Sequence, residues 1–163
     1  MKTDIYIAFY DNRKMCSFIH QKLVRLCTGS NISHVALIFD FGFIKLTPMV
    51  LANKSARLLT EDSLHRAGAK CIFKRYMGST ECCIEEVQRI TNEHKISSIS
   101  SVVFWFFISR WFGGTTYHCG TLAVDFLNKY MNFKLINRNV PIKLMKEIQS
   151  YDSNYDSWAS KGR

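Results

Sequence analysis

The sequence predicts an α+β fold, a small and largely antiparallel sheet packed against helices, and two observations support this prediction. The first half of the 163-residue chain holds short segments in which side chains alternate with the period of a β-strand. The second half holds apolar residues at helical spacing. Because no linker divides the chain, we expect residues 1–150 to form a single domain and residues 151–163, rich in Ser, Asp and Asn, to form a polar, mobile tail.

Five segments of the first half are predicted strands, and turn residues separate them. They are residues 4–10, 34–39, 43–51, 56–59 and 69–76. Gly42 separates the second segment from the third, and Pro48, which has no backbone N–H, predicts an edge position or a bulge for the third. Residues 61–65 are expected to form a turn or a short helix.

Four further segments have the apolar spacing of helices. They are residues 14–27, 79–94, 96–112 and a helix that opens at Cys119. Ser79 and Thr80 are suitable caps for the second of these, and acidic residues follow in its early turns. The last helix follows the break at Gly113 and Gly114, and its face from Cys119 through Leu122 and beyond is apolar, which predicts that this face packs inward.

Residues 102–112 are strongly aromatic and permit two interpretations. The stretch is shorter than the roughly 20 apolar residues of a transmembrane helix, and Arg110 interrupts it. One interpretation is a buried core helix beneath the sheet, which we favour because clustered aromatic side chains in a small domain usually build its core. The other is a pocket for an acyl chain or a patch that faces a membrane.

The chain is basic, with 22 Lys and Arg against 13 Asp and Glu and a net charge of +9. Such a charge is compatible with nucleic acid, anionic lipid or an acidic partner. The basic residues are spread along the chain and no groove-reading motif is present, so we do not expect nucleic-acid binding to be the main role.

Six cysteines, at positions 16, 27, 71, 82, 83 and 119, bear on location and on metal binding. The N-terminus lacks the apolar core of a signal peptide, so we expect a cytoplasmic protein with reduced thiols. No Cys-x-x-Cys pair occurs. Cys16 and His20 have the i, i+4 spacing of half a metal site, although a buried thiol near a surface histidine is the simpler interpretation. We therefore expect no metal and no cofactor.

Two residues have the local context of a catalytic pair. Cys119 opens a helix, where the positive potential of the N-terminus favours a thiolate. His34 is a polar residue at the start of an apolar strand, from which an imidazole can take the thiol proton. The histidine precedes the cysteine in the chain, which indicates a cysteine nucleophile in a permuted order.

These segments resemble a known family. The stretch 26–37, Leu-Cys-Thr-Gly-Ser-Asn-Ile-Ser-His-Val-Ala-Leu, is similar to the histidine segment of the circularly permuted, NlpC-type branch of the papain-like superfamily. Tyr117-His118-Cys119 is similar to the segment that carries the family's nucleophile. This branch includes lecithin:retinol acyltransferase-like proteins and bacterial, phage and poxviral members. The resemblance covers most of residues 4–130 and implies a permuted papain-like fold.

The resemblance also implies roles for particular residues. His34 would be the general base, Cys119 the nucleophile, and backbone N–H groups at the start of the cysteine helix part of the oxyanion hole. The family's third residue, usually an acid or a histidine on the strand after the histidine strand, has no obvious counterpart. Thr47 is the best candidate and Asp40 is the nearest carboxylate in the sequence. His118 is either an exposed loop residue or cap, or a substrate contact.

Two functions from different classes follow. The first is a thiol hydrolase (a peptidase, amidase or lipid esterase) or an acyltransferase, acting on an amide, ester or thioester through an acyl-enzyme. Its substrate would contain an acyl or peptide group, and the basic surface would suit an anionic or lipid substrate. The second is a catalytically weak or inactive binding module of the same fold, such as a viral or phage factor that acts on a host protein in the host cytoplasm.

Overall fold

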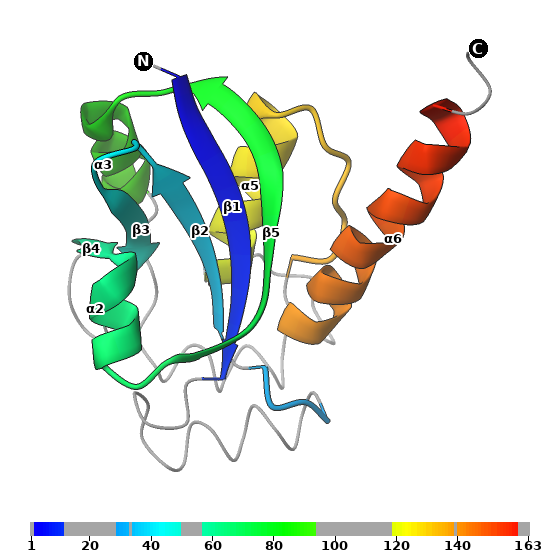
Figure 1. Ribbon diagram of the computed structural model, residues 1–163, viewed down its shortest axis with the longest axis horizontal. Coiled ribbons are helices and arrows are strands. Elements are labelled where there is room, and N and C mark those ends of the chain that lie inside the picture. The colour runs from blue at the N-terminus through cyan, green and yellow to red at the C-terminus, as the bar shows by residue number, and fades with distance from the viewer. Residues whose placement is uncertain are drawn as a thin grey trace.

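A computed structural model describes residues 2–11, 29–32, 34–49, 57–93, 119–138 and 140–159. Its elements, in chain order, are β1 (Lys2–Asp11), β2 (His34–Asp40), β3 (Lys45–Met49), β4 (Arg57–Thr60), α2 (Glu61–Arg66), β5 (Lys70–Glu81), α3 (Ile84–Glu93), α5 (Cys119–Tyr130) and α6 (Pro141–Ala159) (Figure 1). The predicted α+β class with an antiparallel sheet is therefore confirmed.

The five strands form one antiparallel sheet in the order β4-β3-β2-β1-β5. The pairing of β1 with β2 runs from Asp4 opposite Asp40 to Tyr10 opposite His34. The pairing of β1 with β5 shifts register twice, and Ile72 and Met77 are the residues of β5 left without an opposite partner. These irregularities let a long strand bend along β1.

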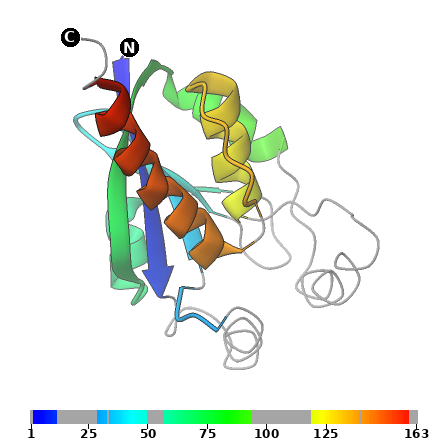
Figure 2. The ribbon, with the colours of Figure 1, turned by 90° about the vertical axis from the view of Figure 1, so that its right-hand side faces the viewer.

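Helices cover the two faces of the sheet unequally. One face carries the larger core, in which Phe9 and Phe39 pack with side chains of α3, α5 and α6. We call the opposite face the α2 face, because Leu64 of α2 packs there on Ala8 and Ala36. Figure 2 shows α3 and α5 together on one side of the sheet and α2 on the other. Each strand thus presents alternate residues to two different environments.

Most predicted elements of the described chain are present, with small changes of boundary. The five strands, the short helix after residue 60 and the helix that opens at Cys119 are confirmed. The expected helix start at Ser79 is wrong, because β5 continues through Glu81 and α3 begins at Ile84. The physical reason is that β1 begins at Lys2, so its first residues pair with Ser79, Thr80 and Glu81.

Pro48 does not mark an edge strand, because β3 lies between β2 and β4. Its missing N–H is nevertheless accommodated: the pairs that join β3 to β2 involve Lys45 and Leu46, both before the proline, whereas Pro48 itself lies opposite Leu58 of β4.

The C-terminal part of the chain is helical where the sequence indicates a polar tail, since α6 continues through Ala159. The predicted helices at residues 14–27 and 96–112 lie outside the described residues, as does the aromatic stretch at 102–112. Within the described part of the chain, no helix is both long enough and apolar enough to cross a membrane.

Candidate functional site

The structure brings the first residues of β2 and α5 to the same end of the sheet (Figure 1). Helix α5 packs along β2 through the larger core, where the ring of Phe126 meets the ring of Phe39 edge-on with centroids 4.9 Å apart. Ala123 and Leu127, on the same helix face, are fully buried. This packing fixes where α5 begins. Cys119 is its first residue, and the side chain of Cys119 lies outside the described part of the structure.

His34 lies at the last pair of the β1–β2 ladder, opposite Tyr10. The two rings are tilted by 43° with their centroids 6.4 Å apart. Since Tyr10 belongs to the cluster on the α2 face, the imidazole of His34 faces the same way. Its Nε2 is buried and has no hydrogen-bond partner within the described residues. The imidazole is therefore available for a further contact at this end of the sheet.

The catalytic pair is thus only partly assembled from described residues. His34 and Cys119 begin elements that pack together, but the imidazole faces the α2 side while α5 covers the other face. A contact between the imidazole and the thiol would have to form around the end of β2. This contact remains a prediction.

Thr47 lies away from His34. The register of β2 with β3, which pairs Phe39 with Leu46, continues to place Thr47 beside Ile38. Ile38 lies four positions along β2 from His34, a distance of about 13 Å along a strand. The Thr47 hydroxyl is buried, and it has no hydrogen-bond partner in the described part of the chain. The structure does not bring this threonine to the imidazole.

Asp40 lies at the end of β2 opposite to His34, and its carboxylate has other partners. It accepts a hydrogen bond from the backbone N–H of Gly42 at 2.9 Å and pairs with the ammonium of Lys45 at 3.4 Å. The same contact raises the pKa of Lys45. Asp40 therefore stabilises the turn between β2 and β3 and does not orient His34.

Tyr10 is the residue beside His34 that the sequence did not single out. Its side chain is fully buried, and the imidazole of His65 in α2 meets its ring edge-on at 5.9 Å. Burial raises the pKa of Tyr10 well above its ordinary value, and the nearby Glu61 carboxylate adds to this effect. The phenol stays protonated at neutral pH. The available sequence signal was the alternation in β1, which sets Tyr10 on the face opposite Ile5, Ile7 and Phe9.

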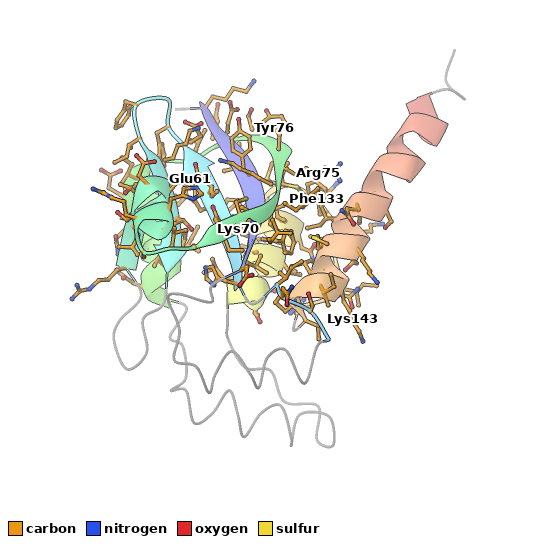
Figure 3. The ribbon with its side chains drawn as sticks, turned by 60° about the horizontal axis from the view of Figure 1, so that its bottom comes forward. Glu61, Lys70, Arg75, Tyr76, Phe133 and Lys143 are labelled. Atoms are coloured by element: carbon orange, nitrogen blue, oxygen red, sulfur yellow. The ribbon has the colours of Figure 1, made fainter. Side chains whose placement is uncertain are left out.

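Glu61 joins this group through an ion pair with β5. Its carboxylate lies 2.5 Å from the ammonium of Lys74, and only 11% of its side chain is exposed. The same ammonium lies 5.0 Å from the centre of the Tyr6 ring. Figure 3 shows Glu61 on the side of α2, well away from Phe133 and Lys143 near α6. The α2 face thus combines charged and aromatic groups, whereas the opposite face is mainly apolar.

Three described cysteines provide a comparison for Cys119. Burial raises the pKa of the Cys71 thiol, with Glu61 adding to the shift and Lys74 opposing it. Burial, together with Glu86, raises the pKa of Cys82 to about 12. Cys83 is exposed, and all three are free cysteines. Neither Cys71 nor Cys82 is therefore placed to act as a thiolate at neutral pH.

The described residues hold no cluster of potential metal ligands. In those ranges, no three or more side chains of His, Cys, Asp or Glu lie close enough together to hold a metal ion. Cys16 and His20, the sequence candidates for half a metal site, lie outside these ranges, as does His118.

Comparisons with models of protein families, with curated proteins and with solved structures each find no match.

Proposed function

We propose that this protein is a cysteine-dependent hydrolase or acyltransferase in which Cys119 is the nucleophile and His34 the general base. One observation supports the proposal most. Cys119 is the first residue of a 12-residue helix that packs on β2, and His34 is the first residue of that strand. A cysteine at a helix N-terminus and a histidine on the neighbouring strand are the two groups that acyl transfer through a thiolate requires.

The chemistry follows from the positions of these groups. The N-terminal potential of α5 favours the thiolate of Cys119, and His34 takes up the thiol proton. The thiolate attacks the carbonyl carbon of an amide, ester or thioester, and backbone N–H groups at the start of α5 stabilise the oxyanion. The imidazolium then protonates the leaving group, which leaves an acyl-enzyme. Water, an alcohol or an amine resolves the acyl-enzyme after giving its proton to His34.

The state of His34 supports this role. Its buried Nε2 has no hydrogen-bond partner within the described residues, so none of them competes for the proton. The β1–β2 ladder ends at the Tyr10–His34 pair. The proposal requires the imidazole and the thiol to meet around that end.

The substrate class follows from the charge and from the sequence. A net charge of +9 suits an anionic substrate such as a lipid head group or an acidic peptide. The aromatic stretch at residues 102–112 would be suited to an acyl chain. We also propose that the protein acts in the cytoplasm, that of the host if the protein is viral or from a phage.

The test measures the rate at which iodoacetamide alkylates each cysteine across about four pH units around neutrality, from pH 5 to pH 9. The rates are read by mass spectrometry in the wild type and in His34→Ala. We expect Cys119 to react rapidly below pH 7 and to slow when His34 is removed. Cys71, Cys82 and Cys83 serve as controls within the same chain. If Cys119 titrates like an ordinary thiol, with a pKa of about 8.5, the proposal fails.

A binding module of the same fold is the second candidate, and one observation favours it. Neither Thr47 nor Asp40 reaches His34, so no acidic or polar residue of β2 or β3 takes the family's third position in the described structure. A module of this kind would contact a host protein and would show an unactivated Cys119. The alkylation profile thus separates the two candidates.

A further inference from the structure

Tyr10 connects His34 to helix α2. Its ring lies near two imidazoles, with centroids 6.4 Å from His34 on β2 and 5.9 Å from His65 on α2. The ring has no exposed surface. A fully buried ring in contact with elements on both sides has little freedom to rotate or to shift.

The surroundings of Tyr10 hold its ring in this position. The next pair on the same face of the ladder is Ala8 opposite Ala36, and these small side chains leave room for the ring beneath α2. Leu64 packs in the same cluster. The Glu61 carboxylate, itself paired with Lys74, lies near enough to the phenol to raise its pKa.

We infer that Tyr10 positions the imidazole of His34, in place of the polar residue that the resemblance would put on β3. The inference rests on the proposed function, because it concerns the general base of that reaction. Tyr10 acts through its ring: the buried ring lies against the imidazole, with centroids 6.4 Å apart and planes tilted by 43°, and this contact restricts rotation of the imidazole. It is a positioning residue, and its phenol exchanges no proton with the substrate. Among the described residues, the other titratable groups around it are Glu61 and His65 of α2 and Cys71 and Lys74 of β5.

The variants Tyr10→Leu and Tyr10→Phe test this inference, with Tyr6→Leu as the matched control. Tyr6 lies on the same strand and the same face, but its ring contacts the tilted ring of Tyr76 and lies beside Lys74 instead of His34. In Tyr10→Leu, we expect alkylation of Cys119 below pH 7 to slow by about two- to fivefold, within the range that the loss of one aromatic pair produces. Alkylation near pH 9 should be unchanged, because there the thiolate forms without help from His34 (ordinary pKa about 8.5).

If Tyr10 acts through its ring, Cys119 should be alkylated at the wild-type rate in Tyr10→Phe and in Tyr6→Leu over the whole pH range. Equal slowing in Tyr10→Phe and Tyr10→Leu, equal slowing in Tyr6→Leu, or no slowing in Tyr10→Leu would each overturn the inference. If Tyr10→Leu does not fold, Tyr10→Met removes the ring while filling more of its volume.

A second measurement separates this inference from the proposed function. Nuclear Overhauser contacts between the ring protons of Tyr10 and those of His34 in the full-length wild type report their contact without any reaction. If these contacts are absent, Tyr10 does not position His34, whatever Cys119 does. If they are present but wild-type Cys119 reacts like an ordinary thiol, the proposed function has failed and the contact alone remains.

Discussion

The Lys74 ammonium lies 2.5 Å from the Glu61 carboxylate, so that β5 is joined to the first residue of α2. β5 is one edge strand of the sheet, and α2 directly follows β4, the other edge strand. The ion pair therefore connects the two edges of the sheet across the α2 face. Because Tyr10 lies in the same cluster, the pair also helps to define the surroundings of His34.

Removing either charge of this ion pair should destabilise the fold. The two side chains are 28% and 11% exposed, so the remaining charge would be only partly hydrated. We expect Glu61→Gln or Lys74→Met to lower the free energy of unfolding by about 1–3 kcal/mol, measured by urea denaturation. Lys45→Met is the control, because it breaks the more exposed pair with Asp40 and should cost less than about 1 kcal/mol. Equal effects at both pairs would contradict this assignment.

The segment after α5 depends on the side chain of Asn128. Its amide donates to the carbonyl of Leu135 at 2.9 Å and accepts from the N–H of Leu135 at 2.8 Å. Asn128→Ala removes both bonds and leaves backbone groups at a partly buried site unpaired, so we expect a loss of about 1–3 kcal/mol in thermal or urea unfolding. Asn92→Ala, at an exposed position of α3, should change stability by less than about 0.5 kcal/mol. A similar loss in both variants would show that Asn128 has no special role.

Gly78 occupies a position that a larger residue should not tolerate. Its φ is +121°, and a Cβ built there would lie 3.0 Å from the Cε of Met131. We expect Gly78→Ala to lower stability by more than about 1 kcal/mol, because alanine is strained at this φ. Gly42 also has a positive φ, +86°, but no atom of the described residues lies within 4 Å of a Cβ built there, so Gly42→Ala isolates the cost of the backbone conformation. Chemical denaturation of both should show the larger loss for Gly78→Ala.

The strands were predictable from the sequence because their pattern is local. The alternation in residues 4–10 and the apolar run from Val35 to Phe39 each depend on neighbouring residues. The start of α3 was not predictable in this way. Ser79 and Thr80 suit a helix cap, but pairing with Asp4 and Thr3, far away in the sequence, keeps them in β5.

The surroundings of His34 depend on register, which the sequence does not specify directly. The sequence favours Thr47 because it lies on the next strand, but the turn after Asp40 sets the pairing of Phe39 with Leu46 and so places Thr47 away from His34. Tyr10 reaches His34 only through the β1–β2 register, and Glu61 reaches Tyr10 only because α2 packs on the same face. The start of a helix at Cys119 was predictable from the local break and the apolar face that follows it.

Alkaline pH should weaken the fold through Cys82. Burial together with Glu86 raises the pKa of this thiol from its ordinary value, near 9, to about 12 in the folded protein. Between these values the folded protein keeps the proton and the unfolded chain loses it, so the unfolded state binds fewer protons and stability falls as pH rises. The contribution of Cys82 is fully present below pH 9 and is lost toward pH 12.

Urea unfolding between about pH 7 and pH 10.5 tests this prediction. The free energy of unfolding should fall by about 1 kcal/mol or more over this range in the wild type, and it should fall less in Cys82→Ala. Cys83→Ala removes an exposed thiol, and its free energy of unfolding should fall with pH as steeply as in the wild type. Burial also raises the pKa of Tyr10, so in Tyr10→Phe the free energy of unfolding should fall less steeply at the upper end of the pH range. A slope that is identical in all four proteins would show that neither buried group retains its proton on folding.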